Sequence, residues 1–169
     1  MEGVLGLWKL RVKRGINLVA RDTKSSDPYL IATLDGQKTK TKVTKASCNP
    51  EWNDELTLTM RDPDAPIHIV VYDQDMFSKD DSMGEAEIDV KPYIECLRTG
   101  GLNPNNVPNG TILGCVHPTE HNCLAKESSI LLEDGKVVQD MNLKLRGVEC
   151  GEVVIQLELV LLPGQNLGV

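Results

Sequence analysis

Four aspartates lie close together in residues 70–84, which read VVYDQDMFSKDDSMG. Asp73 and Asp75 are two residues apart at the end of an expected strand, so both side chains leave that strand on one face. Asp81 follows six residues after Asp75, far enough for a loop to return it toward the pair. Crowded carboxylates repel one another, and Ca²⁺, which takes about six to eight oxygen ligands, compensates them best. This stretch therefore predicts a calcium-binding loop.

A second acidic segment lies upstream, in ARDTKSSDPYL. Asp22 and Asp27 are five residues apart there, in a stretch whose Lys, Ser and Pro content is typical of a loop. One loop rarely fills a calcium coordination shell, so we expect the two segments to meet. The alternative is that these aspartates only cap strand ends in turns.

An aspartate five residues before the Asp of D-P-Y, followed by D-x-D-x5-D before Met-Gly, resembles the pattern of a calcium-binding C2 domain. The resemblance implies two Ca²⁺ ions at one end of a β-sandwich, held by Asp22, Asp27, Asp73, Asp75 and Asp81, with the backbone of Arg21 and Gln74. Asp80 is expected outside this shell, although a one-residue shift in the loop would exchange it with Asp81.

The remaining sequence predicts an all-β domain. Eight alternating or apolar segments are expected to form an eight-stranded antiparallel β-sandwich: residues 4–12, 29–34, 37–45, 55–60, 67–72, 85–90, 136–145 and 151–162. One strand precedes the first acidic segment and a long strand closes the chain, which resembles the type II topology of C2 domains. Residues 92–97 predict a short helix that proline opens, and about 98–135 form an insertion within a single domain spanning 1–169.

Composition limits the classes of function. The net charge of −7 argues against non-specific nucleic-acid binding, and at first against an anionic membrane. Five aspartate ligands carry −5 and two Ca²⁺ ions add +4, which leaves about −1 at that tip. No signal peptide or membrane span is recognisable, and the five scattered cysteines suit a reducing cytoplasm. No arrangement for nucleophilic catalysis is evident, so we expect no enzyme activity.

Two groups of side chains could contact lipid. Lys38, Lys40 and Lys42 alternate along one expected strand, and Lys45 extends the group. They are either a solvated strand face that prevents edge pairing or a site for phosphoinositide headgroups or an acidic protein surface.

Apolar and basic residues also occur in the acidic segments themselves. Met76 and Phe77 are adjacent apolar residues in a polar loop, and they either fold under that loop or enter the acyl boundary of a membrane. Arg21 and Lys24 in the other segment could meet lipid phosphates. We therefore expect one end of the molecule to contact the membrane surface.

The segment HNCLAKESSILLEDGKVVQDMNLKLRGVECGEVVIQLELVLLPG resembles the signature region of the plant C2-domain abscisic-acid-related proteins, and most of the chain shares that resemblance. It implies calcium-dependent binding to the plasma membrane by a monomer, recruitment of abscisic-acid receptors, and a cytoplasmic and nuclear distribution. The insertion is then the partner surface, and His121, Asn122, Cys123 and Leu124 are expected to bind the partner. The resemblance also implies an alternative, activation of an unconventional GTPase.

Four residues of the insertion have the ligand types of a zinc site: Cys115, His117, His121 and Cys123. Their spacing is not a common zinc pattern. The sequence leaves open whether this group binds a metal.

Overall fold

The computed structural model describes residues 3–20, 26–100 and 107–167. Its strands are β1 (Gly6–Ile16), β2 (Pro28–Leu34), β3 (Gln37–Lys40), β4 (Glu51–Met60), β5 (Ile67–Asp73), β6 (Asp81–Ile88), β7 (Ile112–Val116), β8 (Ser128–Glu133), β9 (Lys136–Lys144) and β10 (Glu152–Leu161), and its helix is α1 (Lys91–Gly100). Within these ranges no helix is long and apolar enough to cross a membrane.

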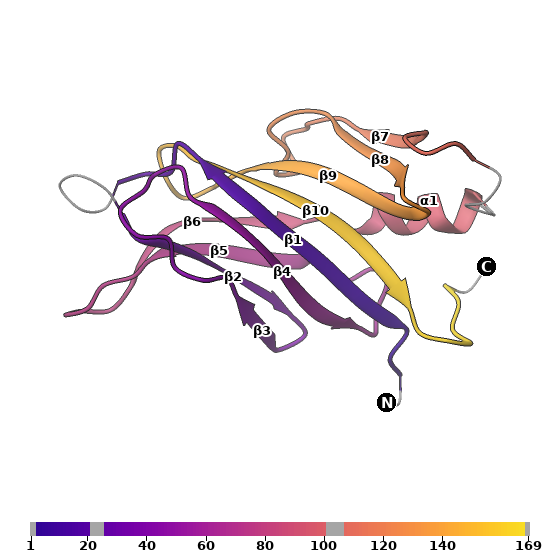
Figure 1. The fold of residues 1–169 in the computed structure, drawn as a ribbon, viewed down its shortest axis with the longest axis horizontal. Helices are drawn as coiled ribbons and strands as arrows, with labels where there is room; N and C mark the ends of the chain where they lie inside the picture. Colours follow the sequence, from indigo (N-terminus) through magenta and orange to yellow (C-terminus); the bar gives the residue numbers. More distant parts are fainter. Residues whose placement is uncertain (1–2, 21–25, 101–106, 168–169) are drawn as a thin grey trace.

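Two antiparallel sheets form the sandwich in Figure 1. One has the strand order β4-β1-β10-β9-β8-β7 and the other has the order β3-β2-β5-β6. The last strand pairs with the first, with Trp8 opposite Leu159, and β4 flanks the first strand on its other side. The expected C2-type sandwich, its topology and its short helix are confirmed.

The core lies between the sheets because alternate residues of the strands point inward. Burial alternates along β2 and β5, for example, where every second side chain is buried. The Trp8 ring packs edge-on against Tyr93 of α1, with 5.5 Å between ring centroids. The Tyr93 hydroxyl donates to the Val137 carbonyl and accepts from the Leu159 amide, which fixes the helix against the sheet.

The described chain has ten strands, whereas the sequence predicted eight. The additional pair, β7 and β8, belongs to the insertion and extends the larger sheet beyond β9. The sequence pattern that would predict this pair of strands is weak because β7 includes Gly114 and its pairing with β8 is irregular. The insertion is therefore partly built into the sandwich.

The third strand also ends earlier than predicted, at Lys40 rather than Lys45. Thr41 is buried, and its hydroxyl accepts a hydrogen bond from the Leu30 amide at 3.0 Å. The Lys42 amide turns away and donates to the Asp54 carboxylate. Because these contacts redirect the backbone, Lys42 and Lys45 lie in the segment that follows β3.

Candidate functional site

The two acidic segments meet at one end of the sandwich. Strands β2 and β5 are neighbours, with Pro28 opposite Asp73, so Asp27 arrives beside the end of β5. The Asp27 amide donates to Asp73 Oδ1 at 2.8 Å, and the Gln74 amide donates to the Asp27 carbonyl at 3.0 Å. Figure 1 shows the β5–β6 loop projecting from this end, away from both termini. The topology thus joins segments that are 46 residues apart.

Two more aspartates of the predicted ligand set belong to the same loop and its end. Asp81 begins β6, is exposed, and lies opposite Asp73 in the antiparallel pairing. The Asp75 carboxylate accepts hydrogen bonds from the Phe77 amide at 2.9 Å and the Ser78 hydroxyl at 2.7 Å. These bonds, that of the Phe77 amide most, stabilise the ionised carboxylate and lower the pKa of Asp75.

Asp80 has a different environment from the neighbouring Asp81. One carboxylate oxygen of Asp80 accepts from the Asp75 amide at 2.9 Å, and the other accepts from the Tyr29 hydroxyl. The bond from the Asp75 amide, followed by that from Tyr29, lowers the pKa of Asp80. Its two oxygens are thus engaged within the protein, whereas the exposed Asp81 faces solvent.

The donor set suits calcium in kind, because carboxylate and carbonyl oxygens are the ligands of this hard cation. Its side chains, however, are held by protein hydrogen bonds: the Asp27 carboxylate, for example, accepts from the Ala46 amide at 2.7 Å. Over residues 3–20, 26–100 and 107–167, no three acidic, His or Cys side chains are grouped closely enough to hold a metal ion. Arg21, Asp22 and Lys24 lie outside these ranges.

The tip of the β5–β6 loop carries two exposed apolar side chains. Met76 is 82% exposed and Phe77 is 97% exposed. The structure therefore excludes the alternative in which Phe77 folds under its own loop. Adjacent exposed apolar side chains of this kind can form a contact site for a membrane or another protein.

A basic surface, Lys38, Lys40, Lys42 and Lys45, begins beside this loop, and all four side chains are exposed. Lys38 and Lys40 share one face of the edge strand β3, opposite Thr33 and Ile31 of β2. Lys40 Nζ lies 5.9 Å from the centroid of the Tyr29 ring. Lys45 Nζ donates to Gln74 Oε1 at 3.2 Å, which connects the basic surface to the acidic loop.

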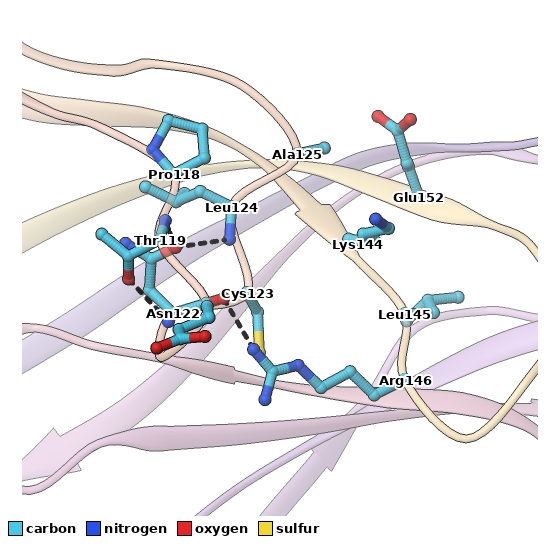
Figure 2. A pocket seen from close by; sticks show the side chains of 11 residues that line it. Pro118, Thr119, Asn122, Cys123, Leu124, Ala125, Lys144, Leu145, Arg146 and Glu152 are labelled. Carbon is cyan, nitrogen blue, oxygen red and sulfur yellow. Dashed lines mark hydrogen bonds between the residues drawn. The ribbon is translucent and has the colours of Figure 1, made fainter.

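The insertion folds back as a turn beside the β9–β10 connection. The Arg146 side chain donates to the Asn122 carbonyl at 2.7 Å (Figure 2), and the Lys144 amide donates to the Cys123 carbonyl. A hollow of about 710 Å³ opens here between Pro118, Glu120, Leu124, Lys144, Arg146 and Glu152. His121 is exposed, Asn122 and Leu124 are half-buried, and Cys123 is buried.

The possible zinc ligands have separate partners. His117 Nδ1 lies 3.2 Å from Glu127, and the exposed His121 lies beside Glu120. Cys123 Sγ is buried and accepts a hydrogen bond from the Glu87 amide. In the described ranges these residues do not form a metal-binding group.

Tyr29 has a role at this end that the sequence did not suggest. Tyr29 follows D-P and occupies one of the outward-facing positions of β2, which marks it as a surface aromatic residue. Nothing in its neighbourhood indicates a partner 51 residues away, so the bond to Asp80 is visible only in the fold.

Comparisons with known proteins agree with this architecture. The family model described as "C2 domain" matches residues 6–107. Two solved structures have the same fold. One is the calcium-bound pair of C2 domains of Extended-Synaptotagmin 2 (TM-score 0.64, 20% identity, 94% of this chain and 46% of that chain). The other is the first C2 domain of plant Extended Synaptotagmin 1 (TM-score 0.59, 17% identity, 94% and 97%).

Closer relatives are found among plant proteins. "Protein C2-DOMAIN ABA-RELATED 4" of Arabidopsis thaliana is 51% identical over 98% of this chain and 92% of its own length. "Protein C2-DOMAIN ABA-RELATED 1" of the same plant is 50% identical over 98% and 99%. "GTPase activating protein 1" of Oryza sativa subsp. japonica is 49% identical over 96% of each chain. The chain therefore belongs to the plant C2-domain ABA-related family and has a C2 fold.

Proposed function

We propose that this protein is a non-enzymatic adaptor that binds anionic phospholipid when calcium fills the site between its acidic segments. The contact between Asp27 and Asp73, beside the exposed Met76 and Phe77, carries the proposal. Two Ca²⁺ ions would be held by Asp22, Asp27, Asp73, Asp75 and Asp81, with the backbone of Arg21 and Gln74. When bound, calcium would offset the negative charge and leave coordination positions for lipid phosphates.

The protein's own side chains supply the other membrane contacts. The basic surface and, from the first acidic segment, Arg21 and Lys24 would attract anionic headgroups, at about 1 kcal/mol for each basic residue near the membrane. Lys42 is held only loosely, with Nζ 3.8 Å from Asp54 and its side chain 88% exposed, so it remains available. Attraction by lysines alone requires no calcium, and their contribution should therefore persist at a lower level in a chelator.

Sedimentation with phosphatidylserine vesicles tests the main proposal. The protein should pellet with the vesicles in calcium and remain mostly in the supernatant in EGTA. Equal sedimentation under both conditions would show that binding does not depend on calcium and would overturn the mechanism.

Replacement of Phe77 by Ser should weaken binding to these vesicles in calcium by at least about tenfold, because burying a Phe side chain contributes about 1.5–3 kcal/mol. The thermal midpoint should not change, since Phe77 is 97% exposed. Ile112→Ser is a matched control, because it removes an exposed apolar residue from β7 in the insertion. If both variants bind as the wild type does, Phe77 does not enter the membrane.

The insertion would hold the protein partner at the membrane. Its hollow combines apolar, basic and acidic side chains, which suits a protein surface better than a small molecule. The family's relation to abscisic acid favours a receptor of this hormone as the partner, contacted through His121, Asn122, Cys123 and Leu124. The protein would remain peripheral at the plasma membrane in calcium and cytoplasmic or nuclear otherwise.

A second function is supported by the rice relative named "GTPase activating protein 1". Arg146 is exposed at the hollow, and an arginine supplied in trans can stabilise the transition state of GTP hydrolysis. Hydrolysis by a purified candidate GTPase should then rise on addition of this protein and should not rise with Arg146→Ala. If the wild type gives no stimulation, this alternative is wrong.

A further inference from the structure

A chain of hydrogen bonds connects the outer face of the smaller sheet with the β5–β6 loop. The Tyr29 hydroxyl of β2 donates to one oxygen of Asp80, and the other oxygen accepts from the Asp75 amide at 2.9 Å. The two ends of the loop are thus closed on each other and attached to a neighbouring strand. Asp75 comes directly before the exposed Met76 and Phe77, so this attachment also fixes the base of the apolar tip.

The Tyr29 side chain, which anchors the loop, is itself held by several contacts. The Tyr29 ring stacks on Tyr72 of β5, with 5.8 Å between centroids and 26° between planes, and Lys40 Nζ lies over it. Burial first, and then the bond to Asp80, raises the pKa of Tyr29 to about 12, in agreement with a hydroxyl that donates to a carboxylate. Lys40 belongs to the basic surface, so the basic surface and the acidic loop share this aromatic anchor.

We propose that Tyr29 and Asp80 are positioning residues that hold the β5–β6 loop ready for its ligand. One oxygen of Asp80 bonds the Tyr29 hydroxyl and the other bonds the Asp75 amide, so Asp80 links the loop backbone to β2. The part of this inference that concerns calcium rests on the function proposed above; the part that concerns loop order does not. Without the Tyr29 hydroxyl, the loop must be ordered when calcium binds, and affinity falls by the cost of that ordering.

Hydrogen–deuterium exchange in EGTA tests the anchor without any ion. In Tyr29→Phe, amides of residues 74–80 should exchange faster than in the wild type, while the aromatic stack remains. Tyr72→Phe is the matched control, because it removes a hydroxyl from the other ring of the same stack and leaves the Tyr29–Asp80 bond intact. Equal exchange in all three proteins would overturn the inference.

Calcium titration calorimetry on four proteins tests whether Tyr29 acts through Asp80: wild type, Tyr29→Phe, Asp80→Ala and the double variant. Tyr29→Phe should weaken calcium binding by about three- to tenfold, which corresponds to the net free energy of one typical intramolecular hydrogen bond. The same change should have no effect in the Asp80→Ala background.

The outcomes separate the inference from the proposed function. An equal effect of Tyr29→Phe in both backgrounds, or no effect in either, would overturn the inference while calcium binding by the wild type stands. If titration of the wild type with calcium gives no heat of binding, the proposed function fails and the calcium part of the inference fails with it. Faster hydrogen–deuterium exchange in Tyr29→Phe would then still support the loop anchor.

Discussion

Asp73→Asn is expected to abolish calcium-dependent binding to anionic vesicles and to weaken calcium affinity by about 100-fold or more, because affinity follows the number of charged ligands. Asp73 is 3% exposed, and its Oδ1 accepts from the Asp27 amide at 2.8 Å. Asparagine has the same shape, and its carbonyl oxygen can accept the same bond. The substitution therefore removes negative charge where the two acidic segments meet and keeps the contact that joins them.

Calorimetry with calcium and vesicle sedimentation measure this effect. Asp64→Asn is the matched control, since it removes the same charge from a position before β5, at the opposite end of that strand. The control should bind calcium and vesicles as the wild type does. Wild-type behaviour in Asp73→Asn would mean that the acidic segments do not form the calcium site, and a loss in both variants would indicate only an effect of net charge.

Much of the fold could be predicted because strand periodicity is local. The two-residue repeat of Ile67, Ile69 and Val71 identifies β5 and its buried face, and the D-x-D spacing then places Asp73 and Asp75 at its end. The pairing of β2 with β5 is not local. The sequence predicted only that the two acidic segments meet, from the calcium shell and the C2 resemblance, and the structure has this meeting in the contact between Asp27 and Asp73.

The parts that were missed depend on side chains distant in the sequence. The third strand ends at Lys40 because Thr41 bonds to Leu30 and Lys42 bonds to Asp54, and neither partner is suggested by the alternating lysines. The role of Asp80 depends on Tyr29 in the same way. Sequence spacing distinguished Asp80 from Asp81 but gave no reason for the presence of both.

Gly84→Ala is expected to lower the free energy of unfolding by about 2–5 kcal/mol, from backbone strain and overpacking together. Gly84 has φ +110, and a Cβ there would lie 2.7 Å from Val148 Cγ2 and 2.9 Å from Leu145 Cβ. Its neighbour Glu85 exchanges two backbone hydrogen bonds with Arg146, so β6 of one sheet is joined here to the β9–β10 connection of the other. A side chain at position 84 would push these two elements apart, just after the β5–β6 loop.

Thermal unfolding in EGTA should show this as a midpoint lowered by roughly 4–20 °C, given the usual 2–4 °C for each kcal/mol in a domain of this size. Gly36→Ala is the matched control, because Gly36 has φ +79 in the β2–β3 turn but no atom within 4 Å of an added Cβ. The free energy of unfolding of Gly36→Ala should fall only by the cost of backbone strain, about 1–2 kcal/mol. Equal losses in the two variants would contradict the steric explanation, because left-handed backbone is common to both positions and the contact with Val148 and Leu145 exists at only one. A larger loss in Gly84→Ala would show that the end of the sandwich carrying the acidic loop depends on close approach of its two sheets.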